Sequence, residues 1–177
     1  WVYERMPINE AATDGVLFHK PVIHDQKIYA IVGNTVYCHD LANGQPIWSQ
    51  EINGNLSVSG ILIYQNRLVV NGGDDALVAL DVQNGQVLWR GEGSGTSSFL
   101  PGRELNGVLY FSGGGSGKIH AVDLETGQTI WRLEAGMVEP EADDWKPDVY
   151  VVAGKNGEKG RIVAMTHQHA YCFPAAR

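Results

Sequence analysis

The sequence predicts an all-β fold built from a repeated unit. An aspartate, a short turn ending in glycine and then a tryptophan recur in the same order within residues 40–48, 81–89 and 123–131. The three tryptophans are 41 and 42 residues apart, a period typical of stacked or radial repeat folds. The chain also holds 22 glycines among its 177 residues, which suits a protein with many tight turns.

Each copy of the repeated phrase has the composition of a β-hairpin. In the second copy, the short apolar runs 78–80 and 87–89 flank a turn that contains Asn84 and Gly85. Short runs rich in β-branched and aromatic residues around an Asn-Gly or Thr-Gly pair are typical of hairpin strands. The glycine can adopt a positive φ without a Cβ clash, and Asp81 can accept hydrogen bonds from backbone N–H groups of the turn. The tryptophan places one large ring per repeat, as packing between neighbouring units would require.

The full pattern, Ala-x-Asp-x-x-(Thr/Asn)-Gly-x-x-x-Trp, resembles the tryptophan-docking motif of the PQQ-like (quinoprotein) β-propeller repeats. Two copies fit it completely, and the first departs only at Cys38, where the motif has alanine. The matching positions are Asp40, Gly44 and Trp48; Ala79, Asp81, Asn84, Gly85 and Trp89; and Ala121, Asp123, Thr126, Gly127 and Trp131. The resemblance implies a β-propeller of four-stranded antiparallel blades, with each tryptophan docked onto the turn of an adjacent blade. We therefore assign these residues a structural docking role.

The repeat period places the whole chain, residues 1–177, in a single propeller domain or partial propeller. We expect its four blades at approximately 16–52, 56–93, 97–136 and 147–177. The strands of the first three blades are expected at 16–18, 27–32, 35–40 and 47–51; 60–64, 67–71, 76–81 and 87–90; and 97–100, 108–112, 118–123 and 129–133. Residues 1–6 are expected to form the outer strand of a neighbouring or closing blade.

The fourth blade is degenerate and admits two alignments. In the first, which keeps the repeat period, residues 149–153 form the second strand and Thr166 replaces the motif aspartate. In the second, residues 161–174 align without gaps with residues 27–40, so the last blade lacks its outer strand and residues 1–5 supply it. About four blades either close as a four-blade ring or form half of a larger one. Propellers of this family usually have more than four blades, which favours the half-ring.

Composition excludes several classes of partner. The formal net charge is −7 and the pI about 5.3, so we expect neither nucleic acid nor an acidic membrane surface as a partner. No apolar stretch is long enough to span a bilayer. Residue 1 is a tryptophan and no signal peptide opens the sequence, so we expect a processed chain or a piece of a longer one. Cys38 and Cys172 lie in different blades without metal-ligand spacing and are expected to be free thiols.

Polar clusters elsewhere in the sequence support no catalytic, cofactor-binding or metal-binding assignment. His167 and His169 share one side of a strand, but zinc needs three or four ligands. The neighbours Asp74 and Asp75 lack the ligand spacing of a dedicated calcium site. The glycine-rich run 113–117 lacks the lysine ending and the helix of a phosphate-binding loop. A charged connector is predicted from Glu139, Glu141, Asp143 and Asp144.

Two classes of function fit these features. The first is a non-catalytic propeller that acts as a binding or scaffold module. Its partner would be a protein or glycan on the face or rim of the ring, and the rest of a larger propeller could also pair with it. The second is a portion of a PQQ-dependent alcohol or sugar dehydrogenase, which would use PQQ with calcium as cofactors. The resemblance to PQQ-like repeats implies both, because those dehydrogenases carry the same tryptophan motif.

The cysteines and tryptophans distinguish the two classes. Many of the alcohol-oxidising dehydrogenases have a vicinal cysteine pair over the quinone, and this sequence has no Cys-Cys pair. The motif also commits three of the five tryptophans to docking. The sequence therefore favours a binding module without a cofactor over an enzyme. The resemblance implies a location in the bacterial cell envelope or outside the cell, which would be periplasmic, outer-membrane-associated or extracellular.

Overall fold

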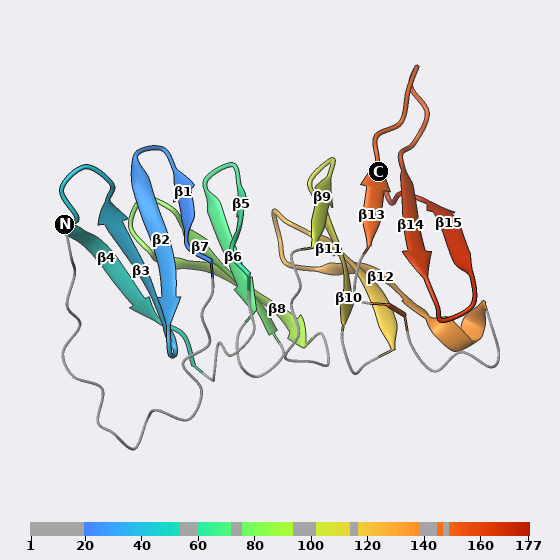
Figure 1. Ribbon diagram of the computed structural model, residues 1–177, viewed down its shortest axis with the longest axis horizontal. Helices are drawn as coiled ribbons and strands as arrows, with labels where there is room; N and C mark the ends of the chain where they lie inside the picture. Colours follow the sequence, from blue (N-terminus) through green and yellow to red (C-terminus); the bar gives the residue numbers. More distant parts are fainter. Residues whose placement is uncertain are drawn as a thin grey trace.

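The computed structural model describes residues 20–53, 60–71, 76–93, 102–113, 117–138, 145–146 and 149–177. Within these ranges the chain forms four antiparallel sheets, and in each sheet neighbouring strands are also consecutive along the chain. Figure 1 shows the sheets side by side in an open row, with the first and the last at opposite ends. The prediction of an all-β fold of β-propeller type is confirmed, with the sheets arranged as an open series of blades.

Three of the sheets have four strands and the last has three in the described part of the chain. The first sheet contains β1 (Val22–His24), β2 (Lys27–Val32), β3 (Thr35–Asp40) and β4 (Pro46–Glu51). The second contains β5 (Leu62–Tyr64), β6 (Arg67–Asn71), β7 (Ala76–Asp81) and β8 (Val87–Gly93). The third contains β9 (Arg103–Leu105), β10 (Val108–Gly113), β11 (Lys118–Asp123) and β12 (Thr129–Glu134), and a 3₁₀ helix (Ala135–Met137) follows it. The fourth contains β13 (Tyr150–Val152), β14 (Arg161–Met165) and β15 (Ala170–Pro174).

The hydrophobic core is divided into three clusters that lie between successive sheets. Side chains of a strand alternate between its two faces, so each inner sheet contributes to two clusters. In β6, for example, Val70 belongs to the cluster shared with the first sheet and Val69 to the cluster shared with the third. The third cluster joins the third and fourth sheets and includes Trp145, which is 2% exposed. Packing between sheets therefore holds the row together.

The register of the outer hairpins explains the small residue of the repeated motif. Cys38 lies opposite Trp48, Ala79 opposite Trp89 and Ala121 opposite Trp131. The pairing shifts by one residue immediately after each of these small residues, as in a β-bulge. A small side chain opposite the indole leaves space for the ring to lie along the sheet.

The fourth sheet follows the gapless alignment of residues 161–174 with residues 27–40, and the alignment that kept the repeat period is wrong. One backbone hydrogen bond recurs in all four sheets and fixes the equivalence: Leu41 N–H to Gln26 O, Val82 N–H to Asn66 O, Leu124 N–H to Gly107 O and Ala175 N–H to Gly160 O. Strands β14 and β15 are thus the equivalents of β2 and β3. Thr166 lies in the β14–β15 hairpin, where its Oγ1 accepts the N–H groups of Gln168 and His169.

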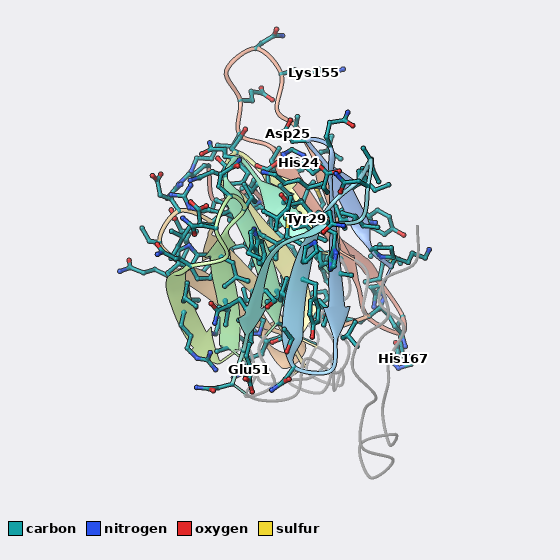
Figure 2. The ribbon with its side chains drawn as sticks, turned by 90° about the vertical axis from the view of Figure 1, so that its left-hand side faces the viewer. His24, Asp25, Tyr29, Glu51, Lys155 and His167 are labelled. Carbon is teal, nitrogen blue, oxygen red and sulfur yellow. The ribbon has the colours of Figure 1, made fainter. Side chains whose placement is uncertain are left out.

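A longer loop accounts for the misleading period. Strands β1 and β2 are joined by the two residues Asp25 and Gln26, whereas residues 153–160 separate β13 from β14. The extra residues shift the later strands by roughly one strand length, so counting a constant period assigns β13 to the second position instead of the first. Figure 2 shows Lys155 at the tip of this loop, beyond the sheet end that carries His24 and Asp25.

The innermost strands are three residues long and were located poorly from sequence. The expected strands 16–18 and 97–100 lie outside the described residues, and the structure forms the inner strands at β1 and β9. Both strands are too short to show a strand pattern, since their sequences are Val-Ile-His and Arg-Glu-Leu. Residues 1–6 also lie outside the described ranges, so their role as an outer strand stays a prediction. Within the described ranges, no helix has the length and apolar character that crossing a membrane requires.

Candidate functional site

The first two sheets are joined by the tryptophan of one and the motif turn of the next. The indole N–H of Trp48 donates to the carbonyl of Val82 at 3.1 Å, and the hydroxyl of Tyr29 donates to the same carbonyl at 3.2 Å. The ring of Trp48 lies flat against Gly85, where a Cβ would be only 2.6 Å from the ring atom Cε3. We call such a contact between a tryptophan and the next motif turn a seam.

The second seam repeats the first one sheet further along. The indole N–H of Trp89 donates to the carbonyl of Leu124 at 3.2 Å. A Cβ at Gly127 would lie 2.5 Å from Cε3 of the Trp89 ring. Gly127 has a φ of 75°, and Gly85 in the first seam has a φ of 74°. Glycine is required at both positions for two reasons, because the backbone is left-handed and the ring occupies the space of a side chain.

The motif aspartates organise the turns that receive the rings. Asp123 Oδ1 accepts the backbone N–H groups of Glu125 and Thr126, each at 2.8 Å. Equivalent pairs of bonds are made by Asp81 Oδ1 with Gln83 and Asn84, and by Asp40 Oδ1 with Ala42 and Asn43. These carboxylates accept hydrogen bonds from turn N–H groups that would otherwise bind water. They thereby fix the conformation of the turn against which a seam tryptophan packs.

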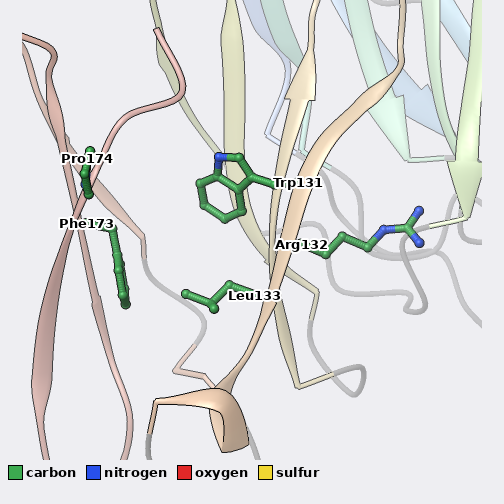
Figure 3. Close-up of a pocket in the computed structure, with 5 residues that line it drawn as sticks. All are labelled: Trp131, Arg132, Leu133, Phe173 and Pro174. Carbon is green, nitrogen blue, oxygen red and sulfur yellow. The ribbon is translucent and has the colours of Figure 1, made fainter.

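Trp131 has the same position in its sheet but different surroundings. The part of the chain that the structure describes supplies no hydrogen bond to its indole N–H, in contrast to Trp48 and Trp89. Its ring lies 6.0 Å from that of Tyr110 and lines an apolar pocket of about 250 Å³ with Leu133, Phe173 and Pro174 (Figure 3). Pro174 occupies the position of the motif aspartate in the fourth sheet, so the pocket lies where a motif turn completes the other seams.

The C-terminal residues bind to the third sheet beside this pocket. The hydroxyl of Tyr110 accepts the backbone N–H of Ala176 at 2.8 Å. The guanidinium of Arg177 forms an ion pair with Asp123. Burial by itself would raise the pKa of Asp123, but the hydrogen bonds from Thr126 and Arg177 outweigh it and hold that pKa below its usual value. Asp123 therefore stays ionised and accepts the N–H groups of the turn that completes the second seam.

His120 is a buried titratable group that the sequence did not reveal. It is 3% exposed and stacks on Phe111, with ring centroids 4.9 Å apart and an interplanar angle of 8°. Among the described residues, its Nε2 has no hydrogen-bond partner. Burial, followed by the positive charges of Arg132 and Lys118, lowers the pKa of His120 from 6.5 to about 4. The ring is therefore neutral at physiological pH and packs as an aromatic residue.

An exposed apolar residue precedes the tryptophan in each of the first three sheets. Ile47, Leu88 and Ile130 are 44%, 43% and 41% exposed, although each lies within a strand. The tryptophan faces the next sheet, so its predecessor faces away from that contact. All three lie on the last strands of their sheets, β4, β8 and β12, which we call the rim. The position before each tryptophan is apolar in every copy, but the sequence alone does not indicate that this stripe is exposed.

A polar pocket adjoins the rim at the second seam. Its volume is about 480 Å³, and its lining consists of Arg90, Gly91 and residues 126–129. The lining offers hydroxyl, amide and guanidinium groups between β8 and the turn that precedes β12. An apolar contact surrounded by polar groups is the usual composition of a protein interface.

The polar clusters considered in the sequence do not converge on a common site. In the described ranges, no group of three or more histidine, cysteine or acidic side chains is close enough to hold a metal ion. His167 Nε2 lies 2.7 Å from Nζ of Lys146. Cys38 is buried, Cys172 is exposed, and both are free, as predicted. The acidic pair 74–75 and the acids at 139, 141, 143 and 144 lie outside the described residues, as does most of the glycine-rich run 113–117.

Comparison with known proteins identifies the relatives of this chain. The family model described as outer membrane protein assembly factor BamB matches residues 5–177. No curated protein matches the chain.

Three solved structures illustrate the fold. BamB from Moraxella catarrhalis is 17% identical with a TM-score of 0.61, and the match covers 92% of this chain and 48% of that one. Quinohemoprotein alcohol dehydrogenase from Comamonas testosteroni is 23% identical with a TM-score of 0.51, over 67% of this chain and 21% of that one. The computationally designed Ika4 protein is 14% identical with a TM-score of 0.62, over 98% of this chain and 100% of that one. At these identities the likenesses establish the fold, and the chain spans about half the length of the BamB structure.

Proposed function

The chain belongs to the outer membrane protein assembly factor BamB family of PQQ-like repeat propellers, and from this premise we propose that it is a non-catalytic binding module of the bacterial cell envelope. The module binds a protein partner along the rim, in the periplasm or at the outer membrane. The motif residues dock neighbouring blades and so hold the rim strands in a fixed series. Their role is structural, and binding falls to the residues that face away from the seams.

The observation that carries this proposal is the stripe of Ile47, Leu88 and Ile130. Three equivalent apolar side chains, each more than 40% exposed, are costly to leave in water unless a partner covers them. Scattered exposed apolar residues are common on protein surfaces, but these three recur at one position of the repeat. The rim also holds a polar pocket at the second seam, and protein interfaces combine apolar contacts with hydrogen-bonding groups of this kind.

The use of the tryptophans also supports binding over quinone chemistry. One face of Trp48 is covered by Gly85 and one face of Trp89 by Gly127. Trp145 is 2% exposed and donates its N–H to the carbonyl of Leu133 at 3.0 Å. These rings contribute to packing between sheets.

A cross-linking experiment tests the rim directly. A photoreactive amino acid is introduced at position 47, 88 or 130 in bacterial cells that express the protein, and adducts are resolved by mass. We expect one adduct of common mass from all three positions. Glu125 is the matched control, because its side chain is 77% exposed but lies in a motif turn away from the stripe. Equal labelling at position 125, or no adduct at the three rim positions, would contradict the proposal.

A second experiment separates the module from a dehydrogenase. The protein is mixed with PQQ and calcium, quinone absorbance and tryptophan fluorescence are followed, and dye reduction is measured with simple alcohols and sugars. We expect neither saturable binding nor turnover. Micromolar binding with turnover would overturn the scaffold assignment in favour of the enzyme, and binding without turnover would also contradict a module that takes no cofactor.

A further inference from the structure

The three exposed apolar residues of the rim share an irregular place in the strand pairing. Between β3 and β4 the register passes from Trp48 directly to Pro46, so Ile47 lies opposite no residue of β3. The register skips Leu88 in the second sheet and Ile130 in the third in the same way. Each of these residues is therefore the extra residue of a β-bulge. Each sheet thus presents one exposed apolar side chain at a bulge of its outermost strand.

These bulges make the outer strands poor templates for a further β-strand. An extra residue interrupts the regular series of edge N–H and C=O groups and increases the local twist of the strand. Bulges are one of the devices by which sheets keep their edges from pairing with other chains. Because β4, β8 and β12 are the outermost strands of their sheets, we expect a partner at the rim to contact side chains and not the strand edges.

The stripe runs across the sheets. Its residues belong to three successive sheets, whose outer strands follow one another along the row in Figure 1. A partner segment that touches all three residues crosses the outer strands and cannot pair with them along its length. Its N–H and C=O groups then need hydrogen bonds within the segment, because burying them unpaired at an apolar contact is costly. An α-helix meets this requirement, since its backbone hydrogen bonds are internal.

Polar side chains accompany the stripe at regular positions. A glutamine stands two residues before each bulge residue, at positions 45, 86 and 128. The main-chain carbonyl of each glutamine accepts the N–H of the motif aspartate of its own turn, at 2.8 or 2.9 Å. The turn thus uses the main chain of the glutamine, while its side chain is exposed. Arg90 and Arg132, two residues after Leu88 and Ile130, are also exposed.

We propose that the protein partner binds the rim through an amphipathic α-helix that lies across the outer strands. The apolar side of this helix covers Ile47, Leu88 and Ile130, and polar groups along its margin bond to the glutamine amides. Acidic residues on that margin complement the charges of Arg90 and Arg132. This contact rests on the rim function proposed above and specifies the element by which the partner binds.

The spacing of the sheets predicts the pattern of the helix. Sheets packed face to face lie about 10 Å apart, and a helix rises about 5.4 Å per turn. Contacts with successive sheets therefore fall roughly two or three turns apart, since the sheets are outermost at the rim. The apolar residues of the partner helix should then recur about every 7 or 11 residues, which keeps them on one face of the helix.

Mapping the cross-linked residues of the partner tests this geometry. Adducts from a photoreactive amino acid at position 47, 88 or 130 are digested, and mass spectrometry locates the partner residue in each. We expect the three partner residues within one segment and at the helical spacing given above. Residues from separate segments, or at spacings that place them on different helix faces, would overturn the helix and leave the rim function intact. No adduct from any of the three positions would overturn both.

A synthetic peptide of the cross-linked segment tests whether the helix itself is required. The peptide carries a fluorescent label, and its binding to the protein is followed by anisotropy. A proline in the middle of the peptide breaks a helix and should weaken binding by about tenfold or more. Proline at the first helical position is tolerated and should leave the affinity within about twofold. Equal effects of the two prolines would overturn the proposal.

Variants of the protein test the bulge residues. Leu88→Ser should weaken binding of the peptide by about tenfold, as loss of an apolar anchor does at other interfaces. Val87→Ser is the matched control, because Val87 is 51% exposed on the same strand but lies in register opposite Leu80. Gln128→Ala keeps the main-chain bond of the turn and should weaken binding by about threefold. The same loss for Val87→Ser as for Leu88→Ser, or no loss for both Leu88→Ser and Gln128→Ala, would overturn the proposal.

Discussion

The second seam and the pocket at Trp131 contain the same motif residues in different environments. At the second seam, the N–H of Trp89 bonds to Leu124 and its ring covers Gly127. At the end of the third sheet, Trp131 lies at the identical place on its strand but lines a pocket. Each seam requires residues from two consecutive repeats, so a repeat with an intact motif makes the contact only when its neighbour provides the turn. A motif match therefore predicts the capacity for a seam and not its presence.

The largest expected effect is the loss of a complete seam. Trp89→Ala removes a ring packed against Gly127 and should lower the free energy of unfolding by about 3–5 kcal/mol. That is a large share of the roughly 5–15 kcal/mol typical of a domain. Trp131→Ala should cost less, about 1–2 kcal/mol, because its ring lies in a partly open pocket. Urea titrations of both variants measure the difference, and equal losses would refute the distinction between the two sites.

The turn beneath the ring should be nearly as sensitive. Gly127→Ala places a Cβ 2.5 Å from the Trp89 ring at a φ of 75°, and we expect a loss of about 2–3 kcal/mol. Gly157 is a matched control, since its φ is 83° but nothing lies within 4 Å of its Cβ position. Gly157→Ala should show only the backbone cost of about 1–2 kcal/mol. Thermal melts with the same loss for both variants would mean that the ring adapts to the added methyl group.

A pH titration examines His120, which lies against the cluster between the second and third sheets. Its pKa is about 4 in the folded chain against an ordinary 6.5, so between these values the unfolded chain binds the proton and the folded chain does not. Stability should be complete above pH 6.5 and should fall toward pH 4, by at most about 1.4 kcal/mol per pH unit. His120→Phe should flatten this part of the profile. An unchanged profile in the variant would assign the pH dependence to other groups.

The smallest expected effect isolates the indole hydrogen bond. Trp89→Phe keeps an aromatic ring near Gly127 but leaves the Leu124 carbonyl without its donor, beyond any change from the smaller ring. Trp131→Phe makes the same change of ring where the described residues offer no acceptor. The difference between the two losses should be about 0.5–1.5 kcal/mol, measured by denaturant titration. No difference would indicate that solvent replaces the bond in the second seam.

The repeat period predicted the fold class and most of the outer three strands of the first three sheets. These features depend on residues close together in the chain. Asp81 bonds to N–H groups two and three residues ahead, and Gly85 takes its positive φ within the same turn. The period failed in the fourth sheet, because the eight-residue loop 153–160 displaces the later strands along the sequence. A count of residues cannot distinguish this loop from a repeat that begins late.

The inner strands and the functional surface were less accessible from sequence. Strands of three residues, such as β1 and β9, are too short to show an alternating pattern, and their positions follow from pairing with longer neighbours. The rim stripe was present in the sequence as an apolar residue before each tryptophan. Its exposure depends on the tertiary structure, because the tryptophan side of each outer strand packs against the next sheet and the preceding residue faces away.

By itself, the sequence determined that this chain forms repeated hairpins of a PQQ-like propeller, because hairpin turns and strand alternation are local. Tertiary structure alone decided which tryptophans complete a seam. The N–H of Trp48 finds its acceptor 34 residues away and that of Trp89 finds one 35 residues away, and those carbonyls belong to the neighbouring sheet. Tertiary structure also decided that His120 is buried and neutral and that Ile47, Leu88 and Ile130 are exposed. Burial of a side chain depends on which sheet packs against it, and no short segment contains that information.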